Sequence, residues 1–173
     1  MSGPAPLPRD PRIAPGVELI ELEAVLIDEQ RWDAWLALFL PDCEYWIPAW
    51  KGDGTLTEDP QRELSNVYYS NRSGLEDRIL RIRSGRSPAS TPLPRTTHLV
   101  SHVFPTAAPE PERLQLRSSW TCQVYFPRPH TSHCFFGRSE YDLRRQDGAW
   151  RIARRKCVML NDRLPTMFDI YCA

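Results

Sequence analysis

The four histidines are the side chains in this sequence best suited to acid–base or metal chemistry. His98 and His102 are four residues apart in a segment with strand character, where that spacing spans about 13 Å. Two ligands of one metal ion must each come within about 2 Å of it, so we expect hydrogen-bonded strand histidines here instead of a metal site. His130 and His133 lie in a proline-bounded loop without a nearby carboxylate to complete an iron triad, and we expect a surface pair.

The spacing of the cysteines does not predict an iron–sulfur site. Iron–sulfur clusters need thiolates, or thiolates and histidines, at close spacing, and the sequence has no Cys-x-x-Cys and no Cys-x-His. It also has no phosphate-binding glycine loop and no Gly-x-Ser-x-Gly elbow. We therefore predict no catalytic residue, cofactor or metal in this chain. The cysteines are expected to be small core or interface residues: Cys43, Cys122, Cys134, Cys157 and Cys172.

Basic and large apolar side chains alternate near the C-terminal end. The basic ones are Arg144, Arg145, Arg151, Arg154, Arg155 and Lys156. Two interpretations stay open, a solvated surface with ion pairs inside the chain and a surface that docks onto an acidic partner. Arg154 and Lys156 are expected to share a strand face with Trp150, Ile152 and Val158, a mixture typical of a wet interface.

Aromatic side chains suggest the same kind of surface. Tyr45 and Trp46 would point to opposite faces of one strand, so at least one of them is expected to leave the core for a groove or a partner. The polar face of residues 115–125 is expected to join neighbouring chains. The predicted interface residues are Trp46, Trp50, Tyr68, Tyr69, Arg117, Trp120, Arg154 and Lys156.

The composition sets the class of protein. The 173 residues favour one domain, and 41% hydrophobic with 25% charged residues is typical of a globular chain. Lysine plus arginine equals aspartate plus glutamate, 22 against 22, so no overall field attracts nucleic acid. We find no secretory leader and no apolar run long enough to span a membrane, and we expect a cytoplasmic protein with reduced thiols.

Helical patterns are confined to the first half of the chain. Residues 1–16 form a proline-rich arm, and 17–173 are expected to be a single domain. Residues 17–28 predict a largely buried helix, and an apolar stripe over about 31–40 predicts a second helix that Pro41 ends. Ser73 with Glu76 forms a capping-box pattern for a third helix, which Gly85 would stop.

Strand patterns dominate the second half. Residues 43–50 and 63–69 are expected to be strands, followed by longer ones at 97–104, 113–126, 132–145 and 149–160. Over 113–126 apolar and polar residues alternate with period two, and Asp147-Gly148 predicts a tight hairpin. Helices first and antiparallel strands second predict an α+β fold, with three helices packed on one face of a strongly curved antiparallel sheet.

Several segments carry a family resemblance. The stretch from Trp46 to Arg83, with "TLTEDPQRE" followed by "NRSGLEDR", resembles the small β subunits of benzoate-type ring-hydroxylating dioxygenases. "RTTHLVSHV" at 95–103 and "VMLNDRLPTMFDIY" near the C-terminus do so too, and the similarity covers about residues 17–171. Residues 105–135 resemble this family in their pattern of residue types more than in the identity of the residues.

The resemblance implies a cystatin-like, nuclear-transport-factor-like cone. It also implies a structural subunit whose copies associate through their sheets and carry three large α subunits in an α3β3 assembly. The Rieske [2Fe-2S] cluster and the mononuclear Fe(II) would belong to the α subunit, with electrons from NADH through a separate reductase. The complex would hydroxylate an aromatic acid in aromatic catabolism.

The same cone fold hosts small enzymes of the dehydratase and isomerase type, so a second function stays open. In such an enzyme an acid–base pair lies in a pocket inside the cone. The candidates here are Asp42, Tyr45, His98 and His102. That alternative requires these side chains to converge on a ligand-sized cavity, and it fails if large side chains fill the cone.

Overall fold

The computed structural model describes residues 10–85, 91–165 and 168–173. Its helices are η1 (Pro11–Ile13), α1 (Ala14–Asp28), α2 (Trp32–Leu36), α3 (Arg72–Arg83) and η3 (Ile170–Cys172). Its strands are β1 (Phe39–Pro48), β2 (Ser65–Tyr69), β3 (Arg95–Pro105), β4 (Arg113–Phe126), β5 (Thr131–Gln146) and β6 (Ala149–Met159). Within these residues, no helix has the length and apolar character that crossing a membrane requires.

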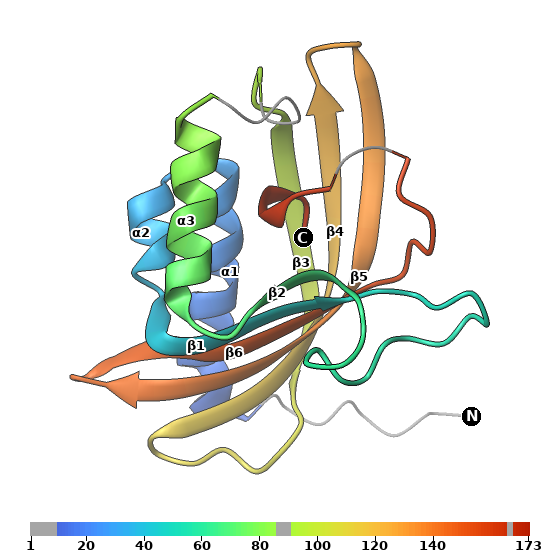
Figure 1. The fold of residues 1–173 in the computed structure, drawn as a ribbon. Helices are drawn as coiled ribbons and strands as arrows, with labels where there is room; N and C mark the ends of the chain where they lie inside the picture. Colours follow the sequence, from blue (N-terminus) through green and yellow to red (C-terminus); the bar gives the residue numbers. More distant parts are fainter. Residues whose placement is uncertain (1–9, 86–90, 166–167) are drawn as a thin grey trace, which may run out of the picture.

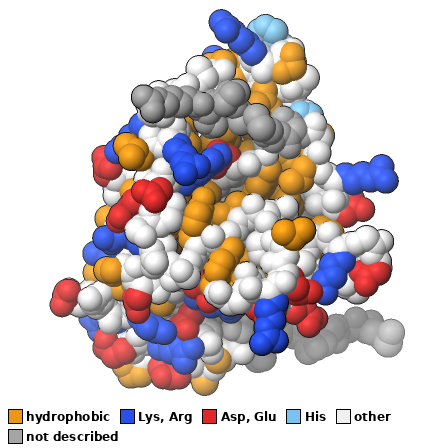
Figure 2. Space-filling model, viewed as in Figure 1, with side chains coloured by type: hydrophobic (Ala, Val, Ile, Leu, Met, Phe, Trp, Pro, Cys, Tyr) orange, Lys and Arg blue, Asp and Glu red, His pale blue; other side chains and the backbone are white. Residues whose placement is uncertain are grey.

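The six strands form one bent sheet in the order β2-β1-β6-β5-β4-β3. Figure 1 shows the three α-helices together on one side of it, with the C-terminal segment between them and β3–β5. All neighbouring strands are antiparallel except β1 and β6, which run parallel. The predicted α+β cone is confirmed, and the sheet is mixed at this one pair. Figure 2 shows the same side of the molecule, with hydrophobic side chains over its centre and charged ones crowding its lower margin.

Alternation along the strands divides the sheet into two faces. In β4 the even-numbered residues from Leu114 to Phe126 are buried and the odd-numbered ones are not, as the period-two pattern predicts. We call the side covered by the helices the inner face and the opposite side the outer face. The β5–β6 hairpin turns at Asp147 and Gly148, which have φ values of 51° and 78°. Positive φ at both turn residues is what a two-residue type I′ hairpin needs, so the predicted hairpin is confirmed.

The first helix packs closely on the sheet. A side chain at Gly16 would place its Cβ 2.6 Å from Cδ1 of Leu116, so the absence of a side chain allows α1 to approach β4. Ile13, one residue before α1, is fully buried. The folded part therefore begins earlier than the predicted boundary at residue 17, and residues 1–9 of the predicted arm lie outside the described residues.

The predicted second helix over 31–40 is too long. Only Trp32–Leu36 is helical, and Phe39 already begins β1, with Pro41 inside that strand. Phe39 pairs with Ile152, and the N–H of Ile152 donates to the carbonyl of Leu38 at 2.8 Å. The run of apolar residues before Pro41 suits a buried strand as well as a helix, and pairing with β6 decides between them.

The third helix begins differently from the prediction and ends as predicted. Its N-cap is Asn71, whose side-chain oxygen accepts from the backbone N–H of Ser73 at 3.0 Å. An asparagine in this position satisfies an otherwise unpaired helix donor, so Ser73 is not the cap. Gly85, just after the helix, has a φ of 65°, the left-handed conformation that commonly follows a helix C-terminus. Residues 86–90 of the predicted loop lie outside the described residues.

Candidate functional site

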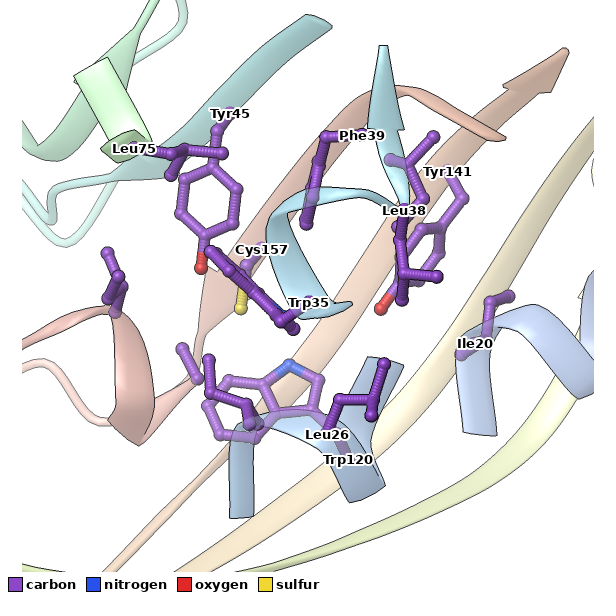
Figure 3. Close-up of a cluster of buried hydrophobic side chains, with 14 of the residues drawn as sticks. Ile20, Leu26, Trp35, Leu38, Phe39, Tyr45, Leu75, Trp120, Tyr141 and Cys157 are labelled. Carbon is purple, nitrogen blue, oxygen red and sulfur yellow. The ribbon is translucent and has the colours of Figure 1, made fainter. Parts of the chain in front are cut away.

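Large side chains fill the interior of the cone. Trp35, Phe39, Tyr45 and Phe135 are all fully buried or nearly so, and they come from α2, β1 and β5. Figure 3 shows the rings of Tyr45 and Tyr141 directed toward the space beside Trp35, with Leu26 and Trp120 below. A core packed in this way stabilises the fold.

A buried ion pair lies among these rings. Glu23 of α1 and Arg155 of β6 approach to 3.0 Å, and each side chain is 4% exposed. Trp35 Nε1 and the Tyr141 hydroxyl donate to the Glu23 carboxylate at 3.1 and 3.2 Å. The guanidinium donates to the hydroxyls of Tyr45 and Tyr141 at 3.0 and 3.1 Å and to the backbone oxygen of Ala173 at 3.0 Å. The polar groups in the interior are thus bonded mainly to one another.

Burial and ion pairing determine the protonation of Arg155, Tyr45 and Tyr141 in this network. Burial lowers the pKa of Arg155, but attraction to Glu23 outweighs it and raises that pKa well above its ordinary value. Burial raises the pKa of Tyr45 and of Tyr141. At neutral pH the arginine therefore stays charged and both phenols keep their protons, which is suited to a structural network.

The four residues of the alternative catalytic pocket do not come together. Asp42 is exposed on β1, whereas Tyr45 is held by Arg155 in the interior. His98 lies on the inner face of β3, and His102 is exposed at a β-bulge in the same strand. With the side chains apart and large rings in the cone, the arrangement gives the dehydratase or isomerase alternative no acid–base site.

His98 instead forms a pair with Asp28 that the sequence did not reveal. Its Nδ1 lies 2.7 Å from Asp28 Oδ1, and its backbone N–H donates to Oδ2 at 2.7 Å. The Thr96 hydroxyl donates to the same carboxylate at 2.7 Å. Burial raises the pKa of Asp28, but the hydrogen bonds and the attraction of His98 outweigh it, so that pKa lies below its ordinary value. The pair ties the end of α1 to the edge strand β3, as expected of a hydrogen-bonded strand histidine.

The donor atoms of the described residues do not fit a metal or a cluster. Within residues 10–85, 91–165 and 168–173, no three His, Cys, Asp or Glu side chains are grouped so that they could hold an ion. His98 Nδ1 is occupied by Asp28, and His102 Nδ1 lies 3.1 Å from the Ser101 hydroxyl. All five cysteines are free thiols. Burial raises the pKa of Cys43 and of Cys172 to about 12, so these thiols are poor metal ligands at neutral pH.

Two predicted interface tryptophans are buried within the chain. Trp120 is 4% exposed and points into the core from the inner face of β4, so its side chain is not part of the outer surface. Trp46 is on the outer face of β1 but 2% exposed, because Lys156 lies over its ring, with Nζ 4.7 Å from the ring centroid. Its Nε1 donates to Ser65 Oγ at 2.9 Å.

The other predicted aromatic residues are half-buried near the β1–β2 edge. Trp50 Nε1 donates to the backbone oxygen of Met159 at 2.8 Å, and the Tyr68 hydroxyl accepts from Gln61 at 2.8 Å. Tyr69 packs against Gly74 at the start of α3. Each therefore has a role within the chain, and a further role in an interface stays a prediction.

The basic run divides between the two faces of the sheet. Arg155 faces inward, whereas Arg154 and Lys156 face outward, and Arg154 lies 3.6 Å from Glu44. A register shift between β5 and β6 turns Ile152 to the inner face opposite Leu143, so Ile152 does not share a face with them as predicted. Arg117 is exposed on the outer face of β4, as predicted.

The outer face carries an apolar row that the sequence did not single out. Leu99, Phe136 and Leu160 are 63%, 42% and 39% exposed. Leu99 pairs with Thr121, which pairs with Phe136, and the N–H of Leu160 donates to the carbonyl of Phe136 at 2.8 Å. The three side chains thus lie in this order across one face of the sheet, with Thr121 between Leu99 and Phe136. Large apolar side chains exposed together on one face are a mark of a protein interface.

Helices on the concave side of a bent six-stranded sheet define the cystatin-like, nuclear-transport-factor-like cone class. A hexachlorocyclohexane dehydrochlorinase of this class matches with a TM-score of 0.60 at 14% identity, covering 90% of this chain and 91% of the other. A match at that identity shows the fold alone. It leaves the function to closer relatives.

Those relatives identify the family. Residues 22–166 match the family model described as "Ring hydroxylating beta subunit". The anthranilate 1,2-dioxygenase small subunit of Acinetobacter baylyi is 40% identical over 86% of this chain and 90% of its own length. The crystal structure of the β subunit of benzoate 1,2-dioxygenase from Burkholderia mallei matches with a TM-score of 0.75 at 31% identity, covering 96% and 99% of the two chains. The chain belongs to the ring-hydroxylating dioxygenase β-subunit family.

Proposed function

We propose that this chain is the structural small subunit of a dioxygenase that hydroxylates a benzoate-type aromatic acid in aromatic catabolism. In this proposal three copies associate through the outer faces of their sheets and carry three large α subunits. The α subunits hold the Rieske [2Fe-2S] cluster and the mononuclear Fe(II), and a reductase supplies them with electrons from NADH. The free thiols suit a reducing cytoplasm.

The apolar row on the outer face is the observation that carries the proposal. Leu99, Phe136 and Leu160 expose large side chains on a sheet whose inner face is already covered. Burying them against another chain removes apolar surface from water, worth about 25 cal/mol per Å². The interior supports the same role, because Glu23 and Arg155 form a buried ion pair that joins α1 to β6.

The relatives support the substrate class. Their names join small or β subunits to anthranilate and benzoate, which are aromatic carboxylic acids. We therefore propose an aromatic carboxylic acid as the substrate of the complex. In this proposal the groups that contact the substrate belong to the α subunit, beside the Fe(II) that it holds.

Coexpression tests the proposal. The chain is produced alone and together with the large subunit encoded beside it, and both preparations are measured for iron, oligomeric mass and turnover of benzoate and anthranilate. We expect iron and turnover only in the joint preparation, with the small chain present in equal number to the large one. Stoichiometric iron in the lone chain, or turnover by it without a companion, would overturn the proposal.

The self-association step has its own variant. Leu99→Asp places a charge at the β3 end of the apolar row, on its most exposed side chain, and we expect the oligomeric mass of the pure chain to fall in light scattering. Leu80→Asp is the matched control, because Leu80 is also exposed, at 67%, but lies on α3. Equal masses for wild type and Leu99→Asp would contradict association through the outer face.

A further inference from the structure

A basic hollow lies beside the apolar row on the outer face. Its volume is about 360 Å³. It is lined by His102, Phe104, Arg117, Ser118, Ser119 and Arg138. Phe104 is 45% exposed, so the hollow adds an aromatic side chain to the exposed apolar surface.

A β-bulge shapes one wall of this hollow. Ser101 pairs with Ser119 and Phe104 pairs with Arg117, so β3 has one residue more than β4 between these pairs. At the bulge, His102 takes a φ of 52°, a left-handed conformation uncommon for residues other than glycine, and stays exposed while Val103 turns into the core. Bulges commonly redirect a side chain next to a functional site, and this one brings His102 to the rim beside Arg117.

The hollow has more positive charge than its surroundings neutralise. Neither Arg117 nor Arg138 forms an ion pair with any residue that the structure describes. The acid nearest in the strand register is Glu140 of β5. It lies opposite Arg117 on β4 and opposite Lys156 on β6. One carboxylate thus faces several basic groups. Guanidinium groups recognise carboxylates through paired hydrogen bonds, so a carboxylate is the chemistry that complements this hollow.

We propose that the basic hollow receives an acidic side chain of a second copy of this chain. This rests on the proposed function, because it takes the outer face as the contact between copies. Arg138 of the hollow follows Phe136 of the apolar row by two residues on the same face of β5, so the two features are neighbours. Arginine and aromatic side chains beside exposed apolar ones are typical of the centre of a protein interface. In a ring of three copies each contact joins two different surfaces, so the carboxylate comes from a part of the second copy outside the basic hollow.

Charge reversal within and outside the hollow tests this inference. Arg117→Glu and Arg138→Glu are made in the full chain, and Arg144→Glu is the matched control, on the same strand and face as Arg138 but about 20 Å away. Circular dichroism and urea unfolding check that each variant folds. We expect both hollow variants to raise the dissociation constant of the oligomer at least about 30-fold and the control to leave it within about threefold.

The outcomes separate this inference from the proposed function. If Leu99→Asp disrupts the oligomer but Arg117→Glu and Arg138→Glu leave it intact, the inference is overturned and the proposed function stands. An equal loss in Arg144→Glu also overturns it, since surface charge in general would then be responsible. Hollow variants that keep the oligomer but lose the large subunit overturn it in favour of that partner. If the wild-type chain stays monomeric, both the proposed self-association and this inference are overturned.

Discussion

The carboxylate of Glu23 and the guanidinium of Arg155 lie 3.0 Å apart in the interior of the cone, where each side chain is 4% exposed. Glu23 is on the first α-helix and Arg155 on the last strand, so the pair joins the two ends of the fold. Removing both charges from water is costly, and their attraction and the surrounding hydrogen bonds offset that cost. The pair therefore matters more for holding this one arrangement than for net stability.

Removing one partner should destabilise the chain strongly. Arg155→Met leaves the Glu23 carboxylate buried without a positive charge, and we expect a loss of about 3–5 kcal/mol in the free energy of unfolding. The double variant Glu23→Leu with Arg155→Met removes both charges and should recover most of that loss. Urea unfolding followed by tryptophan fluorescence measures both. A single variant within about 1 kcal/mol of wild type would show that the pair is dispensable.

The Asp28–His98 contact should give a measurable dependence of stability on pH. The pKa of Asp28 is lowered in the folded chain, so its contribution is complete above the ordinary value of 3.8 and is lost as the pH falls through the lowered pKa. Asp28→Asn should cost about 1–2 kcal/mol at neutral pH, toward the low end because the carboxylate is only half-buried. Unfolding curves from neutral pH down to about pH 3 should show that the difference in free energy of unfolding between wild type and Asp28→Asn becomes smaller as the pH falls below 3.8. A constant difference throughout would contradict the role of the carboxylate charge.

A glycine in β5 should not tolerate a side chain. A Cβ at Gly137 would clash with the backbone oxygen of Val158 on the neighbouring strand, and a backbone atom cannot move aside as a side chain can. We expect Gly137→Ala to lower the free energy of unfolding by about 1–3 kcal/mol or more. Gly52→Ala is the control, because a Cβ there meets nothing within 4 Å. Thermal unfolding compares the two, and equal melting temperatures would refute the clash.

Most of the architecture follows from local patterns. Period-two alternation over 113–126 gave both bounds of β4, and Asp147-Gly148 gave the hairpin, because each depends on neighbouring residues. The second helix was predicted too long because an apolar stripe does not tell a buried helix from a buried strand. Pairing of Phe39 with Ile152 makes that distinction, and it joins residues far apart in the chain.

The site was harder to predict for the same reason. Arg154, Arg155 and Lys156 look alike in the sequence, but strand alternation sends Arg155 alone into the interior. A register shift between β5 and β6 then places Ile152 on the inner face, and no residue type in the sequence indicates that shift. Trp120 looked like an interface residue and is a core residue. The apolar row and the basic hollow combine residues of several strands, so they become visible only when the strands are placed side by side.

The parallel pairing of β1 with β6 has a consequence for how the chain is made. Tyr45 and Arg155, which bond across this pair, are 110 residues apart. During synthesis, β1 leaves the ribosome long before the strand that covers its second edge exists. Until β6 is complete, the nascent chain carries an open apolar strand edge, which is a site for wrong pairing. Productive folding, and with it any docking of partner subunits, must therefore wait until β6 has emerged.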